Sequence, residues 1–275
     1  MRFGFVLPRG DARDAAELAA VAEDAGWDGF FVWESVWGVD AWMALAAAAV
    51  RTERIRLGTM LTPLPRKRPW ELAGQTATLD NLSGGRTILS VGLGAPHEGW
   101  LAFEPDPGRR TRAELLDEGL DVLTGLWAGQ PFRYEGRHYR VTPTDFVPPP
   151  PLVQRPRIPI WVVGGWPAPR SMARAARYDG WLPNLVAKAG EPTGRLSAEQ
   201  LAEGVAWIRE HRAAAGLPME GYDVVAEGAT SDGAAEVVGR WRDAGATWWI
   251  EADWGVEEGK VREYAHARLR AGPPR

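Results

Sequence analysis

The sequence lacks cysteine and has few residues suited to metal or nucleophilic chemistry. None of its 275 residues is cysteine, which excludes disulfide bonds, thiolate-bound zinc, iron–sulfur clusters and a thiol nucleophile. Histidine occurs only at His97, His138, His211 and His266. No HExxH, GxSxG or P-loop motif is present, and no group of residues has metal-ligand spacing. We therefore expect no metal site and neither a zinc nor an iron enzyme.

Long apolar segments and basic runs are also missing. The longest apolar run, Ala41 to Val50, is too short to cross a bilayer. The opening segment MRFGFVLPRG is interrupted too soon by Pro8 to be a signal peptide. Lysine and arginine number 32 against 36 acidic residues, a net charge of −4. This balance is not typical of proteins that bind nucleic acid or a membrane surface, so we expect neither partner and a cytoplasmic protein.

Short apolar runs alternate with helical patterns along the whole chain. Such alternation is typical of βαβ units with a parallel sheet, and eight units favour a closed (β/α)8 TIM barrel in one domain, residues 1–275. An open doubly wound sheet is the alternative. The expected strands are Arg2–Leu7, Gly29–Trp33, Ile55–Leu61, Thr87–Val91, Ile158–Val163, Gly180–Leu182, Tyr222–Ala226 and Thr247–Glu251. The expected helices are Asp11–Ala25, Ala41–Val50, a segment around Leu72 to Leu79, Arg109–Trp127, Ala168–Arg177, Ala198–Ala215, Ala234–Ala244 and Val261–Leu269.

One segment breaks this rhythm after the fourth strand, between Gln130 and Arg157. It contains FRYEGRHYRV, a hairpin-like pattern, followed by four consecutive prolines, Pro148 to Pro151. A run of prolines forms a stiff extended connection rather than a helix. We therefore predict a hairpin insertion in the barrel.

In a closed barrel the active site lies at the carboxyl ends of the strands. Gly164 and Gly165 stand there between a strand and a helix, where glycine lets backbone N–H groups approach a phosphate; they could equally shape a tight turn. Gly92 and Gly94 also follow a strand, but the third glycine of a dinucleotide fingerprint is missing. Several of the 15 tryptophans lie at strand ends. They could form an aromatic mouth for a planar ligand, or they could be core residues.

Acid–base candidates at these strand ends are few. Glu34 ends the second strand and either faces the mouth as a partly buried carboxylate or anchors the loop by hydrogen bonds. His97 lies in the loop after the fourth strand and titrates nearest to neutral pH. Glu98 follows it.

Two long segments resemble a known family. TERIRLGTMLTPLPRKRPWELAGQTATLDNLSGGRTILSVGLG (Thr52 to Gly94) and QRPRIPIWVVGGWPAPRSMARAARYDGWLPN (Gln154 to Asn184) are similar to the luciferase-like monooxygenases, as is the opening FGFVLP. The resemblance implies a barrel oxidoreductase that uses FMN or the deazaflavin F420 and acts on a small organic substrate. It leaves open a homodimer.

The resemblance also implies positions for the cofactor. A bulge after the third strand, often with a non-proline cis peptide, would pack on the ring, and the loop after the fourth strand would line it. The turn after the fifth strand would bind the phosphate, and the end of the sixth would flank the cofactor. The implied cofactor-binding residues are Thr59, Met60, Leu61, Gly92, Gly94, Gly164, Gly165, Trp166, Ala168, Trp181 and Asn184.

The chain departs from the family at the residues used for proton transfer. Well-known members carry a histidine after the acidic residue of the second strand, whereas this chain has Glu34-Ser35-Val36. The implied catalytic candidates are therefore Glu34, His97 and Glu98. The missing histidine leaves a non-catalytic flavin-binding barrel as one alternative, and a barrel that binds another phosphorylated ligand as a second.

Overall fold

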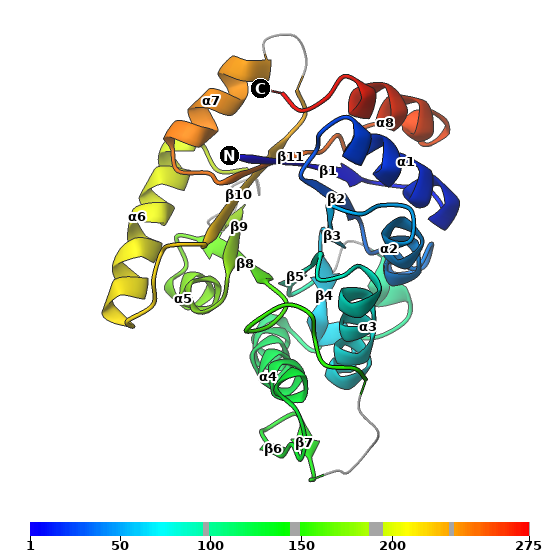
Figure 1. The fold of residues 1–275 in the computed structure, drawn as a ribbon. Coiled ribbons are helices and arrows are strands. Elements are labelled where there is room, and N and C mark those ends of the chain that lie inside the picture. Colours follow the sequence, from blue (N-terminus) through cyan, green and yellow to red (C-terminus); the bar gives the residue numbers. More distant parts are fainter. Residues whose placement is uncertain (96–98, 144–148, 187–194, 231–233, 275) are drawn as a thin grey trace.

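The strands form a closed parallel barrel, which confirms the predicted (β/α)8 fold (Figure 1). The computed structural model describes residues 1–95, 99–143, 149–186, 195–230 and 234–274. Pairing of β3 with β5, Leu57 opposite Thr87, closes the sheet, whose other strands pair in order around it. The barrel strands are β1 (Arg2–Leu7), β2 (Gly29–Val32), β3 (Arg56–Thr59), β5 (Thr87–Gly92), β8 (Ile160–Trp166), β9 (Gly180–Leu185), β10 (Asp223–Gly228) and β11 (Trp248–Glu251).

Helices cover the outside of the barrel, and their ends carry the expected capping signals. Asp11 and Ser197 begin two of them with capping boxes, which satisfy the first free backbone N–H groups, and Pro69 and Pro169 open two others. The helices are α1 (Ala12–Asp24), α2 (Ala41–Ala49), α3 (Pro69–Leu82), α4 (Arg109–Ala128), α5 (Pro169–Arg177), α6 (Ala198–Ala214), α7 (Ala234–Asp243) and α8 (Val261–Arg270), with short 3-10 turns at Leu64–Arg66, Trp100–Ala102 and Glu258–Lys260.

The third barrel strand is interrupted, as the family resemblance implied. After β3 ends at Thr59, the peptide bond between Met60 and Leu61 is cis. The chain then resumes as β4 (Thr62–Pro63), which pairs with the end of β5. The continuous strand expected to Leu61 is therefore wrong at its end, and the predicted bulge is confirmed.

The core has two layers, one inside the barrel and one between the barrel and its helices. Inside, the rings of Phe31 and Trp161 stack with centroids 5.4 Å apart, and Trp248 meets Trp161 edge-on at 5.3 Å. These large rings fit because glycines face them: a Cβ on Gly29 would lie 2.7 Å from Phe31, and one on Gly180 would lie 2.4 Å from Trp161. Pairing large with small residues is how a narrow barrel fills its interior.

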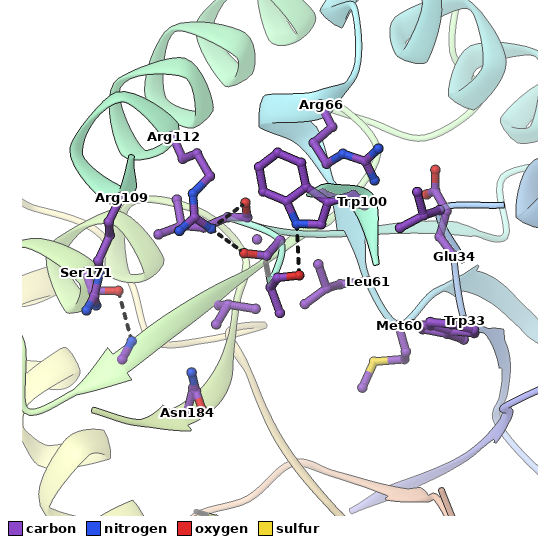
Figure 2. A pocket seen from close by; sticks show the side chains of 18 of the residues that line it. Trp33, Glu34, Met60, Leu61, Arg66, Trp100, Arg109, Arg112, Ser171 and Asn184 are labelled. Carbon is purple, nitrogen blue, oxygen red and sulfur yellow. Dashed lines mark hydrogen bonds between the residues drawn. The ribbon is translucent and has the colours of Figure 1, made fainter. Parts of the chain in front are cut away.

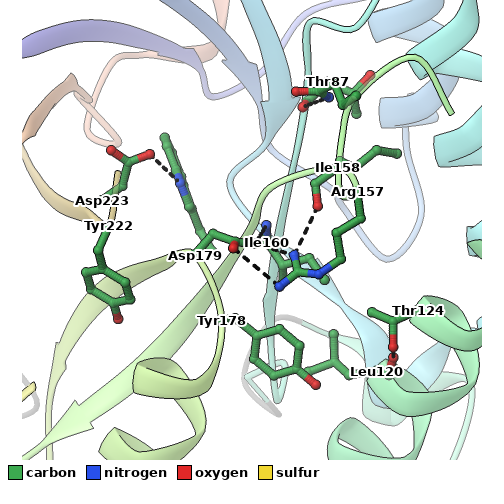
Figure 3. Close-up of polar contacts among 12 residues, drawn as sticks. Thr87, Leu120, Thr124, Arg157, Ile158, Ile160, Tyr178, Asp179, Tyr222 and Asp223 are labelled. Carbon is green, nitrogen blue, oxygen red and sulfur yellow. Dashed lines mark hydrogen bonds and ion pairs between the residues drawn. The ribbon is translucent and has the colours of Figure 1, made fainter. Parts of the chain in front are cut away.

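Polar contacts around the buried Asp223 and the half-buried Arg157 fix the amino end of the barrel (Figure 3). Asp223 accepts hydrogen bonds from the indole of Trp161 at 3.1 Å and from Arg2 at 2.5 Å. Burial raises the pKa of Asp223, against the lowering effect of these partners. Nearby, Arg157 pairs with Asp179, which also accepts the backbone N–H of Ile160 at 2.8 Å. These contacts hold the strand starts together, away from the mouth.

The predicted hairpin is present as β6 (Tyr134–Glu135) and β7 (Arg140–Val141), an antiparallel pair beside α4 (Figure 1). Its turn is anchored by Glu118 of α4, whose carboxylate accepts three consecutive backbone N–H groups, those of residues 137–139. Within the described ranges, no helix combines the length and apolar character needed to span a membrane.

Candidate active site

A cavity of about 460 Å³ opens at the carboxyl ends of the strands, where a barrel enzyme holds its active site. Figure 2 shows most of its walls. The cavity is lined by Trp33, Glu34, Val36, Met60, Leu61, Pro63, Arg66, Gly92, Leu93, Gly94, Ala95, Trp100, Arg109, Arg112, Val163, Gly165, Ser171, Asn184, Leu185 and Val186.

One wall of the cavity is apolar. Met60 and Leu61 project from the bulge after β3, and Val163 is an inward residue of β8. Gly92 stands between them, and a Cβ there would lie 3.1 Å from both Leu61 and Val163. Glycine at this position therefore keeps the wall flat and closely packed, as suits a planar ligand.

A second wall carries three arginines. Arg112 is nearly buried, pairs with Asp106 at 3.1 Å, and donates to the carbonyl of Gly94 at 2.5 Å. Arg66 pairs with Glu104 at 2.7 Å. Both guanidinium groups lie over the ring of Trp100, at 5.0 Å for Arg66 and 5.8 Å for Arg112. Arg109 also lines the cavity and has no acidic partner in the part of the chain that the structure describes.

Ser171 lies on the same side as Arg109 and Arg112 in the view of Figure 2. Its hydroxyl oxygen accepts the backbone N–H of Gly165 at 2.9 Å, so the hydroxyl hydrogen can point toward a ligand. The N–H of Ala168 is bonded to the carbonyl of Gly165 at 2.8 Å. These two backbone donors of the Gly164–Ala168 turn are therefore already used, and Ser171 replaces them as the donor that faces the cavity.

Glu34 lies at the opposite side from Ser171 (Figure 2). Its carboxylate is nearly buried; one oxygen forms an ion pair with Lys67, and the other accepts the hydroxyl of Thr62 at 2.6 Å. Thr59 lies 2.9 Å from Thr62, hydroxyl to hydroxyl, and extends this chain of contacts. Glu34 thus faces the cavity and also fixes the bulge, which combines the two interpretations that the sequence left open.

The structure brings together seven of the predicted site residues and leaves five others outside the lining. His97 and Glu98 lie outside the described residues, so their roles stay predictions. The lining includes Glu34, Met60, Leu61, Gly92, Gly94, Gly165 and Asn184, and it omits Thr59, Gly164, Trp166, Ala168 and Trp181.

The five residues outside the lining either face the helices or contact the lining residues from behind. Trp181 is fully buried on the helix side of β9, where its indole donates to the carbonyl of Gly164 at 2.8 Å. A Cβ on Gly164 would meet that same indole at 2.6 Å, so Gly164 also faces the helices. Trp166 is the last residue of β8, and Ala168 caps α5. Thr59 reaches the cavity only through Thr62 and Glu34.

The arginines, Trp100 and Ser171 were not predicted from the sequence, because none of them directly follows a barrel strand. For Arg109 and Arg112 the sequence does contain an indication of an anion site. The first turn of α4 contains Arg109, Arg110 and Arg112 and no acidic residue, although a helix amino end favours negative charge. Basic residues placed against the helix dipole indicate that an anion is expected there.

The fold and cavity define the protein as a (β/α)8 barrel with a ligand-sized site at its mouth. The family model described as luciferase-like monooxygenase matches residues 1–266, and the chain belongs to this family.

Two relatives with named activities are similar to part of this chain. A Mycobacterium tuberculosis protein proposed to be a coenzyme F420-dependent oxidoreductase is 39% identical over 179 residues, which cover 61% of this chain and 50% of the relative. The F420-dependent glucose-6-phosphate dehydrogenase of Nakamurella multipartita is 30% identical, with 62% and 51% covered. The chain therefore spans about half the length of these curated relatives.

The fold extends over nearly the whole of one solved structure. The coenzyme F420-dependent tetrahydromethanopterin reductase from Methanopyrus kandleri superposes with a TM-score of 0.77, covering 96% of this chain and 97% of that one. At 19% identity this likeness shows the shared barrel fold alone.

Proposed function

We propose that the chain is an oxidoreductase that binds F420 or FMN in the 460 Å³ cavity and acts on a small organic substrate. One observation carries this proposal: the cavity joins an apolar wall at Met60 and Leu61 to a basic end at Arg109 and Ser171. Family membership and the F420-dependent relatives support it.

The residues present fit such a cofactor. Both candidates have a planar aromatic ring, a flexible polyol chain and a phosphate. The cavity volume lies within the range of about 300–1,000 Å³ that is usual for ligand sites of this size. Met60, Leu61 and Gly92 would hold the ring, and Ser171 and Arg109 would hold the phosphate through charge-assisted hydrogen bonds.

The bound ring would supply the redox chemistry, and the protein would supply orientation and electrostatics. Arg66 and Arg112 already have acidic partners, which hold the two guanidinium groups in place at the edge of the cavity. Glu34, held by Lys67 and Thr62, fixes the bulge that carries Met60 and Leu61. Among the described residues that line the cavity, Glu34 is also the one with a carboxylate that could exchange a proton with a ligand.

F420 is the favoured cofactor because both named relatives are associated with it. Its additional anionic groups beyond the first phosphate also suit a cavity with several arginines. FMN stays the second candidate, since the shared ring and phosphate explain the same residues. A non-catalytic barrel is not favoured, because these relatives are named as oxidoreductases.

Replacing the basic end of the cavity should weaken cofactor binding. Ser171→Ala and Arg109→Ala should each raise the Kd for F420 or FMN about 10- to 100-fold, the loss expected for a hydrogen bond to a charged group. Titration followed by the absorbance or fluorescence of the ring measures this. Arg110→Ala is the matched control, because Arg110 is a neighbour on α4 that pairs with Glu114 at 2.9 Å outside the cavity lining. If the three variants bind the cofactor as the wild type does, the phosphate is held elsewhere.

A further inference from the structure

A second cavity of about 270 Å³ continues from the first, toward the barrel interior. The two share Met60, Leu61, Val163 and Asn184, so a molecule in the second would lie against a ligand in the first. The second cavity is also lined by Leu182, Pro183, Val225, Glu227 and Trp254.

Glu227 places a carboxyl group in this largely apolar space. On β10 the side chains alternate: Val225 belongs to the inner core, and Ala226 to the outer core beneath the helices. Glu227 is therefore an inward residue. The next residue confirms the register, because a Cβ on Gly228 would lie 2.6 Å from Trp249, an outer-core ring.

Among the residues that the structure describes, the carboxyl group of Glu227 has one weak ionic partner. One carboxylate oxygen of Glu227 lies 3.6 Å from a guanidinium nitrogen of Arg195, whose side chain is 53% exposed. Burial raises the pKa of Glu227, opposed by the charge of Arg195 and by the indole of Trp254. A half-buried carboxyl group in a cleft, with only a weak partner among the described residues, is a common feature of functional sites.

A carboxylate with a purely structural role has different surroundings in this same protein. Glu251 on the neighbouring β11 faces the helices and is fully buried. It accepts the backbone N–H and hydroxyl of Thr230, both at 2.7 Å, and the indole of Trp249 at 3.2 Å, and it pairs with Arg268. By contrast, a third of the Glu227 side chain is exposed, so a ligand in the second cavity can reach its carboxyl group.

We propose that the Glu227 cavity is the substrate pocket of the oxidoreductase, an inference that rests on the proposed function. It selects a small molecule with an apolar body and one O–H or N–H group, which donates its hydrogen bond to Glu227. The apolar body lies against Leu182, Val225 and Val163. The volume is below the range that is usual for drug-sized ligands, so a bulky sugar phosphate or pterin is not the expected substrate.

Four probes with the same cyclohexyl body test this selection. Cyclohexanol and cyclohexylamine have a donor, methoxycyclohexane has none, and cyclohexanecarboxylate is an anion. Affinities measured by ligand-observed NMR, on cofactor-free and cofactor-loaded protein, should be at least about tenfold stronger for the alcohol or the amine than for the ether and the carboxylate, as expected for one hydrogen bond to a charged group. Equal binding of all four probes, or no binding of any, would overturn the proposal.

Two variants test whether the probes bind at Glu227 and distinguish a neutral hydroxyl donor from a charged amine donor. Glu227→Leu should abolish the preference for both donors, whereas Glu227→Gln should spare the alcohol and weaken the amine, because a neutral amide still accepts a hydrogen bond. Glu203→Leu, at an exposed position of α6, is the control and should bind every probe as the wild type does. Unchanged donor preference in Glu227→Leu contradicts the assignment.

Cofactor titration of the same proteins keeps the two proposals distinguishable. If Glu227→Leu binds F420 or FMN normally and loses the probe preference, the substrate pocket is supported. If the wild type binds no cofactor but still selects the donor probes through Glu227, the proposed function fails while the pocket stands.

Discussion

At the scale of single residues, Glu34 has two tasks that its surroundings make inseparable. Its carboxylate borders the cavity, yet it is also held by Lys67 and by the hydroxyl of Thr62. A buried ion pair is costly to break, because removal of one partner leaves the other charge uncompensated. Substitutions here therefore need separate measurements of turnover, cofactor affinity and stability.

Glu34→Gln should lower turnover by roughly 100-fold, the loss expected when acid–base catalysis is removed. Cofactor affinity should be largely kept, since the amide can still accept the Thr62 hydroxyl. Steady-state kinetics at saturating cofactor, with a parallel titration, measure both quantities. Thr62→Val is the control, because it removes a positioning contact and leaves the carboxylate in place. Turnover preserved in Glu34→Gln, with a lower melting temperature, would retire Glu34 as a catalytic residue.

The sequence could indicate some site residues and not others, for a geometric reason. Met60, Gly165 and Asn184 lie beside the carboxyl ends of barrel strands, so a barrel interpretation places them at the mouth. Arg112 instead enters the cavity from α4, a helix that begins only after a long connection from the end of β5 at Gly92. Which face of that helix meets the barrel depends on tertiary packing, which the local pattern does not encode.

At the scale of elements, the end of β8 shows how one strand serves both the core and the site. Gly164 faces the helices, where the indole of Trp181 and the methyl group of Ala175 leave no room for a Cβ. Gly165 faces the cavity and gives its N–H to Ser171. Two adjacent positions thus require glycine for different physical reasons. The sequence alone could not assign these reasons, because the assignment depends on which face of β8 each residue occupies.

Substitutions at the two glycines should have different effects. Gly164→Ala should lower the free energy of unfolding by about 1–3 kcal/mol, because its Cβ would lie 2.6 Å from Trp181. Gly165→Val should instead weaken F420 or FMN binding by more than about tenfold, or 1.4 kcal/mol, because its Cβ would lie 2.5 Å from Val186 of the cavity lining and the rest of the side chain would project into the cavity. Chemical denaturation and cofactor titration of both variants measure the contrast. Equal effects of the two substitutions on cofactor affinity would show that the strand register is not the cause.

Element boundaries differed from prediction where tertiary contacts extend a strand. Both β8 and β9 run three residues beyond their expected ends, to Trp166 and Leu185. They extend each other by pairing, with Gly165 opposite Asn184 and Trp166 opposite Leu185. Glycine and proline in these segments suggested loops, and the hydrogen bonds between the strands overrode that preference.

At the scale of the whole molecule, the barrel separates stability from function along its axis. The amino end is closed by aromatic rings and by buried groups such as Asp223. The carboxyl end holds both cavities, with Glu34 and Glu227 on different strands. The alternation of strands and helices was sufficient to predict this architecture. The long-range arrangement of arginines and carboxylates around the mouth was not, since it depends on how the barrel closes.

The cavity is expected to bind a flavin-type cofactor with its phosphate at Ser171 and Arg109. The most direct test compares FMN with riboflavin, and F420 with its phosphate-free ring fragment, on the wild type and on the Ser171→Ala/Arg109→Ala double variant. In the wild type, removal of the phosphate should weaken binding by at least about tenfold. In the double variant, the difference between each cofactor and its phosphate-free form should largely disappear. Equal affinity of the wild type for both forms, or an unchanged difference in the double variant, would contradict the account.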